Sequence, residues 1–594
     1  MKIFNHEPHK PHERYGGKAC AIHCIAFLIF FLALIPAYAQ SQRVLPLSSD
    51  IYDEMDALYL LKGMGTPSTS RPWTVSEAKI IIDRIDSQAL NQTEQKLYNA
   101  VSKEIFRKLR FPFGNNVNLD ATLDLALEAY AHTNSKDFTL SGDWNYGYEK
   151  RQPIAKLTVE ADISPWFYFV SDLEYNRNRF NEKDGFRNVD DDLAPNVGIG
   201  AKTSFANPYL FPWRSWAYSK SFITNVPANI DEFDFDWPKR ADISFGGEHW
   251  NLSLARDRIQ WGRGNSGNFV IDNHRDYNEY FRVSAFTDRF KYEWLNVFFP
   301  GTEAGGVLNF FMAHRLEFRF LPSLVFAISE NTMCSSEFFN PRYINPAFIY
   351  HQWYDRDHFN SLAHLELDYT PFSGYRFYSQ AVIDQIQAPW ESADEPGSWG
   401  ILAGVEHARP AFSGVMALSL ECAYTSPLLY RRDLVDFITI GVTDVNGVSQ
   451  PIYIDYLGFP YGGDAMILQL DANCRFPGST FIHGRIFAMI HGAMNFFTSH
   501  NMSGNNNDYA NKTDSTPSGS KDDREYTLGT SLDAQYTIPQ PVSFCKLSAW
   551  GGISCIYKKN KLMISETGTG AGIIYHLKDA AQDFQFVIGV GCTL

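Results

Sequence analysis

The sequence predicts a mainly β protein: a large antiparallel transmembrane β-barrel of about 18 strands preceded by a small α-helical bundle. Three observations predict it. The chain of 594 residues is 15% aromatic, yet its mean hydropathy is −0.26. Side-chain polarity alternates with a period of two residues from about residue 113 onward. The connections between the alternating segments are unequal, with short turns following long polar stretches.

The sequence of residues 1–39 is typical of a secretory signal peptide. Four basic residues precede an apolar run, and Ala37-Tyr38-Ala39 has the small-x-small form of a cleavage site. We therefore expect the mature chain to begin at Gln40, with an uncleaved anchor helix as the alternative.

Residues 40–112 predict a periplasmic helical domain. One helix is expected from Asp50 to Leu61, ended by Gly63. A second is expected after the capping sequence Thr74-Val75-Ser76-Glu77, and a third after Asn91, where the cap pattern repeats. These helices are short, so they must pack on each other or on something larger.

Residues 113–594 predict the barrel. Segments such as 119–128, 156–163, 315–320, 364–369 and 469–475 carry a charged face and an apolar face. Short turns at 163–165 and 370–374 alternate with long polar segments at 176–196, 385–399, 431–455 and 499–524. Because lipid cannot satisfy an open sheet edge, such strands must close on themselves. A soluble β-sandwich is the alternative fold.

Charge and cysteine content exclude several classes of protein. The formal net charge is −15 at pH 7, whereas nucleic-acid-binding proteins present a basic surface, so no nucleic acid partner is expected. The six cysteines beyond residue 39 lack C-x-x-C spacing, so we expect no metal site and no cofactor. Cys545 and Cys555 could pair across neighbouring strands; the alternative is that they are small buried hydrophobes.

No motif predicts catalysis. The chain has no G-x-S-x-G, no H-E-x-x-H and no P-loop sequence. Residues 262–267 have the form G-x-G-x-x-G, but they lie in a strand–loop context, where a nucleotide site needs a strand followed by a helix. We therefore expect no catalytic residues.

Three segments combine aromatic and polar side chains as carbohydrate sites do, since aromatic faces stack on sugar C–H groups while polar groups bond to hydroxyls. The candidate polysaccharide-binding residues are Trp261, Arg263, Asn265, Trp353, Asp355, Arg356, Trp390 and Trp399. For each of them, the alternative is an interfacial aromatic or a charge inside the barrel.

Four elements resemble the capsule-assembly protein Wzi family. They are the opening Asp50-Ile51-Tyr52 with Arg71-Pro72-Trp73-Thr74, the run from Asp257 to Asn268, Phe339-Asn340-Pro341-Arg342-Tyr343-Ile344 followed by Val382 to Ile386, and the run from Leu457 to Asp464. The resemblance implies an outer-membrane barrel with a periplasmic bundle at its mouth. It also implies a non-catalytic lectin that holds capsular polysaccharide on the cell surface. Surface polysaccharide, outer-membrane lipid and capsule-export machinery are the partners expected of such a protein, and we expect a monomer.

Three other interpretations stay open. A porin-like diffusion channel would need an open lumen, and an outer-membrane hydrolase would need a Ser/His pair on adjacent strands. Residues 53–85 also resemble a single S-layer-homology repeat, which would imply contact with a wall polymer.

Overall fold

The structure, a computed structural model, describes residues 41–594 except 115, 139–140, 148–149, 178–185, 189–209, 213–219, 276, 300–307, 337–348, 351–358, 386–396, 432–434, 446–447, 479, 495–514, 543–544 and 567–571. The predicted signal peptide and its cleavage site lie outside the described residues.

Three helices form where the sequence predicts them: α2 (Ile51–Leu61), α3 (Val75–Asp83) and α4 (Gln92–Ile105), with the 3-10 turn η1 (Ser87–Ala89) before α4. The Thr74 side chain accepts a hydrogen bond from the backbone N–H of Glu77 at the start of α3. Asn91 and Glu94 form a complete capping box on α4. Gly63 has φ of 67° just beyond α2, a backbone conformation that favours glycine.

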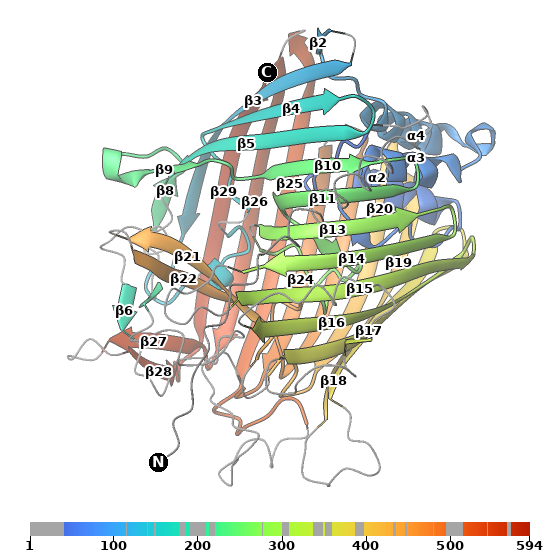
Figure 1. The fold of residues 1–594 in the computed structure, drawn as a ribbon. Coiled ribbons are helices and arrows are strands. Elements are labelled where there is room, and N and C mark those ends of the chain that lie inside the picture. Colours follow the sequence, from blue (N-terminus) through green and yellow to red (C-terminus); the bar gives the residue numbers. More distant parts are fainter. Residues whose placement is uncertain are drawn as a thin grey trace, which may run out of the picture.

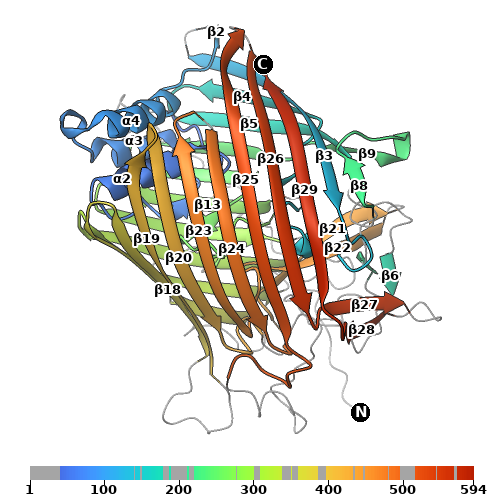
Figure 2. The ribbon, with the colours of Figure 1, turned by 180° about the vertical axis from the view of Figure 1, so that it is seen from behind.

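A closed antiparallel barrel of 18 strands follows (Figures 1 and 2), as predicted. The last strand pairs with the first, from Gln585 opposite His132 to Thr593 opposite Asp124, so the sheet has no free edge. In order around the barrel the strands are β3 (Val117–His132), β4 (Ala155–Ile163), β5 (Phe167–Arg177), β10 (Ala241–Gly246), β11 (Trp250–Asp257), β13 (Asn278–Phe286), β14 (Phe290–Phe298), β15 (Leu308–Leu321), β16 (Leu324–Ser336), β17 (Phe359–Phe372), β18 (Tyr375–Gln385), β19 (Ser398–Ala411), β20 (Gly414–Thr425), β23 (Ala465–Phe476), β24 (Thr480–His491), β25 (Glu525–Val542), β26 (Cys545–Lys559) and β29 (Ala581–Thr593).

The chain also forms short strands in addition to the 18 of the barrel wall. β2 (Phe111–Phe113) pairs with β3, so the chain enters the sheet two residues before the expected boundary at 113. β8 (Phe222–Thr224) and β9 (Phe233–Asp236) extend the ladders of β3 and β5. The remaining short strands are β1 (Ser70–Arg71), β6 (Phe186–Asn188), β7 (Leu210–Pro212), β12 (Gln260–Trp261), β21 (Ile438–Val445), β22 (Val448–Tyr456), β27 (Leu562–Glu566) and β28 (Gly572–His576).

The two ends of the barrel differ as the sequence predicts. Turns of a few residues join β4 to β5, β10 to β11, β13 to β14, β15 to β16, β17 to β18, β19 to β20, β23 to β24 and β25 to β26. All of these turns lie at one end of the barrel, which we call the short-turn end. The connections after β5, β20 and β24 are much longer and lie at the opposite end, the long-loop end. The predicted loop at 499–524 falls here, although residues 499–514 of it lie outside the described residues.

Apolar side chains cover the outside of the barrel and charged ones face its lumen. On β17, Glu366 and Asp368 are buried, whereas Leu365, Leu367 and Tyr369 are 38–45% exposed. On β29, Asp583 and Gln585 are buried, while Phe584, Phe586 and Ile588 are exposed. This distribution is the reverse of that in a soluble sandwich, where the apolar face is buried between the sheets. Here the apolar face is the outer one, as in barrels that are surrounded by lipid.

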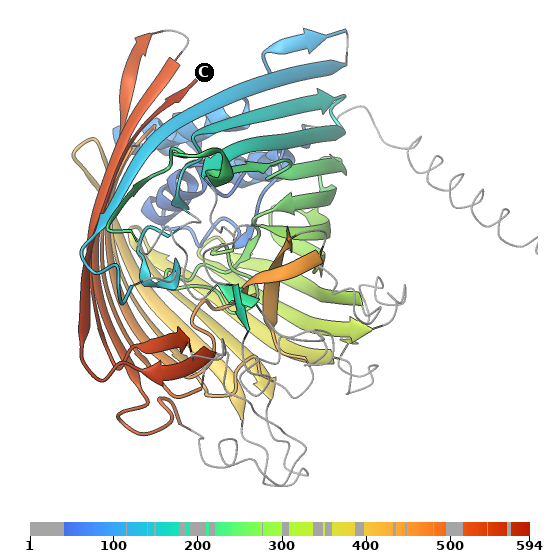
Figure 3. The ribbon, with the colours of Figure 1, turned by 90° about the vertical axis from the view of Figure 1, so that its left-hand side faces the viewer.

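The helices lie inside the short-turn end of the barrel. Figure 3 shows them, in blue, between the red strands of one wall and the green strands of the opposite wall. Gly65 donates its backbone N–H to Pro322 in the β15–β16 turn, and Gly374 in the β17–β18 turn donates to Leu60. In the part of the chain that the structure describes, no helix has the length and apolar character needed to span a membrane.

Candidate functional site

The lumenal wall against which the helical domain packs is ionic, and residues 65–71 run along it. The backbone N–H of Thr66 donates to Asp368 on β17 at 2.7 Å. The Ser68 hydroxyl donates to Glu317 on β15 at 3.1 Å. Lys291 on β14 is buried and donates both to the carbonyl of Ser70 and to Glu77 of α3. The segment between α2 and α3 is therefore part of the filling of the lumen.

The β11–β13 connection enters the lumen from the long-loop end and meets that segment. β12 pairs with β1, with Trp261 opposite Ser70 and Gln260 opposite Arg71. The backbone N–H of Gly262 also donates to Thr69 at 3.1 Å. A loop from one end and a domain at the other thus join in a small two-stranded sheet within the barrel.

Glycine is required in this connection for packing. Gly262 has φ of 113° and Gly267 has φ of 136°. A side chain at Gly262 would collide with Asn268 and Gln380, and one at Gly267 would collide with Pro460. The G-x-G-x-x-G pattern therefore allows the loop to pass close to the wall. In the described part of the chain the element that follows it is the strand β13, whereas a phosphate site of this kind needs a helix N-terminus.

Trp261, a predicted sugar-binding residue, lies at the centre of this junction. Its side chain is fully buried, and the indole N–H donates to Glu293 on β14 at 2.8 Å. A residue with no exposed surface has no face for a sugar to stack on. The described position of Trp261 matches the alternative interpretation, a residue of the barrel interior.

Arg263 joins the loop, the helical domain and the wall. Its guanidinium donates to Asp56 of α2 at 2.7 Å and also to Glu406 of β19. Arg71 donates to the same Asp56 carboxylate at 2.6 Å. Burial alone would raise the pKa of Asp56, but the guanidinium groups of Arg263, Arg71 and Arg376 hold it well below its usual range.

Asn265 keeps an exposed side chain, unlike Trp261. Its backbone N–H donates to Glu421 on β20, and its amide donates to Ser419 at 2.8 Å. Tyr378 on β18 donates to the same Glu421 carboxylate at 2.8 Å. Asn265 is therefore held against the wall but still faces lumenal space, so its role in sugar contact stays a prediction.

Trp399 lies on the outer face of the barrel. It is 41% exposed on β19, on the same face as Ile401, and it stacks on Tyr424 of β20 with ring centroids 4.9 Å apart. This position fits an interfacial aromatic, which was the alternative for this residue. The other candidates, Trp353, Asp355, Arg356 and Trp390, lie outside the described residues.

The long-loop end of the lumen holds a hydrophobic core. Phe269 and Ile271 of the β11–β13 connection pack with Tyr430 and Phe459 of the β20–β23 connection against wall residues such as Leu402. All five are fully buried. The lumen is thus filled by polar contacts near the helices and by apolar contacts near the long loops.

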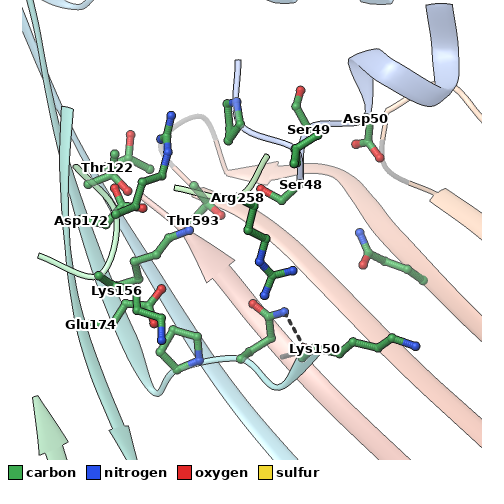
Figure 4. A pocket seen from close by; sticks show the side chains of 18 of the residues that line it. Ser48, Ser49, Asp50, Thr122, Lys150, Lys156, Asp172, Glu174, Arg258 and Thr593 are labelled. Atoms are coloured by element: carbon green, nitrogen blue, oxygen red, sulfur yellow. Dashed lines mark hydrogen bonds between the residues drawn. The ribbon is translucent and has the colours of Figure 1, made fainter. Parts of the chain in front are cut away.

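A cavity of about 1540 Å³ remains beside this filling, and we call it the vestibule. It lies between the helical domain and the wall formed by β3, β4 and β5. Figure 4 shows Ser48, Ser49 and Asp50 of the helical domain on one side and Thr122, Lys156 and Glu174 of the wall on the other. Eleven of its lining residues are Lys or Arg and eight are Asp or Glu, so the lining carries charges of both signs.

The vestibule extends from the short-turn end to a cluster near the long-loop end. Lys546 and Thr593 line it at the short-turn end, whereas Tyr130 and Tyr146 line it at the far end. There the Glu128 carboxylate accepts hydrogen bonds from both tyrosine hydroxyls and from the Trp550 indole. The lining residues were missed from the sequence, because the polar face of a strand does not reveal which part of a lumen stays unfilled.

One Ser/His contact bears on the hydrolase alternative. The Ser329 hydroxyl on β16 lies 3.5 Å from Nδ1 of His364 on β17. Glu366 approaches that same nitrogen at 3.8 Å, whereas a catalytic triad places its carboxylate at the other ring nitrogen. Both Ser329 and His364 are buried. Among the residues described, no group of three His, Cys, Asp or Glu side chains could hold a metal ion.

The cysteine expectation needs a correction. Cys545 and Cys555 lie on the same strand, β26, and so cannot pair across neighbouring strands. Ten residues of extended chain separate them by about 33 Å.

Comparisons with known proteins bear on the fold. No family model matches the sequence, and a search of curated proteins gave no match. Among solved structures, the chain is similar to Wzi, an outer-membrane protein involved in group 1 capsule assembly in Escherichia coli and described as a carbohydrate-binding β-barrel. The TM-score is 0.52 at 11% identity, over 92% of this chain and 98% of that one.

Two porins give lower scores. A BenF-like porin from Pseudomonas fluorescens has a TM-score of 0.37 at 9% identity, over 80% of this chain and 99% of that one. OccK2 from Pseudomonas aeruginosa, solved with glucuronate, has a TM-score of 0.36 at 9% identity, over 80% and 96%. At 11% identity the likeness to Wzi concerns the fold alone, and that fold is the outer-membrane β-barrel.

Proposed function

We propose that this protein is a plugged outer-membrane barrel that binds and retains capsular or other surface polysaccharide without catalysis. The observation that carries the proposal is the filled lumen. The helical domain enters from the short-turn end, the β11–β13 connection enters from the long-loop end, and the two pair through Trp261 and Ser70. A diffusion channel needs a continuous aqueous path, and this junction occupies the part of the lumen beside the vestibule.

The orientation follows from the loops. Outer-membrane barrels place short turns in the periplasm and long loops outside the cell. The helical domain would then be periplasmic, and the long-loop end of the barrel would face the cell surface. The apolar outer face of β17 and β29 supports a position in lipid.

The chemistry of the remaining surfaces suits sugars. Carbohydrate recognition combines aromatic faces with hydrogen-bonding side chains. The predicted loop segments have that combination in their sequence, and the vestibule combines tyrosines with Lys, Arg, Asp and Glu. The similar barrel Wzi is described as carbohydrate-binding, which supports the same class of ligand here.

The test has two arms. Protein purified in detergent is titrated with the surface polysaccharide of its own host, and a deletion strain is assayed for polysaccharide retained on the cells. We expect saturable binding and reduced retention. The substitutions Trp353→Ala and Trp390→Ala should weaken binding, whereas Trp399→Ala, on the outer face, is the matched control. No binding together with unchanged retention would refute the proposal.

A diffusion channel is the second candidate, and the vestibule favours it. A path along β3 and β5 would conduct if the cluster around Glu128, Tyr130 and Tyr146 opened. Substitution Tyr146→Ala removes one of the hydroxyls that bond to Glu128. Under this alternative the variant should conduct more than the wild-type protein in a planar bilayer, whereas under the binding proposal both should conduct little.

A further inference from the structure

Two cysteine thiols meet at the short-turn end of the barrel. Cys545 is the first residue of β26, and Cys592 lies next to the end of β29. Their Sγ atoms are 2.6 Å apart. Non-bonded heavy atoms rest at about 3.5–4.0 Å, and a disulfide bond is about 2.05 Å long. The two sulfur atoms are therefore closer than non-bonded packing allows.

The strand register explains why these two thiols meet. β26 and β29 are antiparallel neighbours, with Leu547 opposite Cys592 and Lys546 opposite Thr593. Since side chains alternate between faces, Cys545 lies on the same face as Leu547, and hence on the same face as Cys592. The two cysteines are diagonal neighbours on one face of a paired ladder, which is within cross-strand reach.

Both side chains are also accessible. Cys545 and Cys592 are only partly buried, whereas Cys334 is buried inside a hydrophobic cluster of three aromatic residues and a methionine. Cys592 lies on the outer face of β29, on the same side as Ile588. A soluble oxidant would therefore have to reach the pair at the rim, where β26 begins and β29 ends, whereas a thiol packed in the interior would be shielded.

We propose that Cys545 and Cys592 form a disulfide that ties β29 to β26. The step needs an oxidant, which we assign by class to a thiol–disulfide oxidoreductase in its disulfide form. The thiolate of one cysteine attacks that disulfide and displaces one of its sulfurs as a thiolate. The second cysteine then attacks the mixed disulfide, and the oxidoreductase leaves as a dithiol. The two thiols lose two electrons and two protons in all.

The cross-link would act where the barrel closes. β29 is hydrogen-bonded to β26 on one side and to β3 on the other. The bond spans 47 residues of chain, which include the β27–β28 hairpin. Cross-linking so long a loop restricts the unfolded chain and opposes fraying of β29 at the rim. The inference relies on the proposed outer-membrane location, because that places the pair in an oxidising compartment.

The test is a peptide map of the protein isolated from membranes and alkylated before any reductant is added. We expect one disulfide-linked pair of peptides that contains Cys545 and Cys592 and separates on reduction. Complete alkylation of both thiols in the unreduced wild-type protein would overturn the proposal.

Two variants sharpen the experiment. In Cys545→Ser, Cys592 should become fully alkylated and the unfolding temperature should no longer fall on reduction. Cys555→Ser lies on the same strand and should leave the cross-link and its effect unchanged. Polysaccharide binding is measured separately on wild-type protein, so a missing cross-link and a missing lectin activity would be told apart.

Discussion

At the scale of single residues, two tryptophans of similar sequence context have opposite positions. Trp261 is fully buried in the lumen, whereas Trp399 is exposed on the outer face. Both lie in segments that mix aromatic and polar residues. Composition cannot separate them, because the face to which a strand residue points depends on the register of a barrel whose closure is not local.

Substitution of Trp261 tests its position. Trp261→Ala should destabilise the junction by about 3–5 kcal/mol, since it leaves a large cavity and removes the indole hydrogen bond to the buried Glu293. Trp399→Ala should lower the free energy of unfolding by much less than Trp261→Ala does. The measurement is limited proteolysis of the folded protein, with cleavage expected in the β11–β13 connection of the Trp261 variant only. Equal resistance in both variants would show that Trp261 does not hold the loop in the lumen.

Asp56 offers a second residue-level prediction. Its carboxylate holds Arg71 and Arg263, so Asp56→Ala leaves two guanidinium groups buried without this partner. Breaking a buried pair costs about 3–5 kcal/mol. Amide hydrogen exchange should speed up in α2 and in the β11–β13 connection. Asp83→Asn is the control, because Asp83 is exposed and pairs with Lys79 on its own helix. Unchanged exchange in Asp56→Ala would contradict the network.

At the scale of elements, local sequence patterns were sufficient to predict where the helices and strands form. The caps at Thr74 and Asn91 predicted the helices and the period-two segments predicted the strands, because each of these signals depends on neighbours along the chain. The inward course of residues 257–275 was not predictable. It depends on partners such as Glu406 and Glu421, which lie more than a hundred residues away. The pairing of Cys545 with Cys592 was missed for the same reason.

The docking of α2 should depend on pH. Glu54 is buried against the β23–β24 turn, where it accepts the backbone N–H of Gly478, and burial raises its pKa to about 7. The unfolded value is about 4.3. Between these values the folded protein binds more protons than the unfolded one, so stability falls as pH rises through this window.

The Glu54→Gln variant should remove that dependence. Above pH 7 it should be more stable than wild type by about 1–3 kcal/mol, and near pH 4 the two should be equal. Hydrogen exchange in α2 at pH values from 4 to 8, corrected for intrinsic exchange rates, measures this. A wild-type protein whose α2 docks more tightly as pH rises would contradict the assignment.

At the scale of the whole molecule, the outside of the barrel should behave as a lipid-facing surface. Ile588 on β29 is 67% exposed. Near the midplane of a bilayer, Ile588→Lys should lower the free energy of unfolding by about 2–4 kcal/mol. At an exposed position in water, such a substitution changes the free energy of unfolding by no more than about 0.5 kcal/mol. Unfolding from lipid vesicles measures the difference. Gln582→Lys, closer to the long-loop end, is the matched control and should cost little. Equal stabilities would argue against lipid contact.

We propose that the barrel closes in a membrane around a filled lumen. Single-channel recording in a planar bilayer tests it most directly, with vesicle flotation to verify insertion. We expect the inserted wild-type protein to carry no sustained current, and removal of residues 41–109 to produce one. A steady ohmic current through the wild-type protein would contradict the filled lumen, and with it the proposed polysaccharide-binding role.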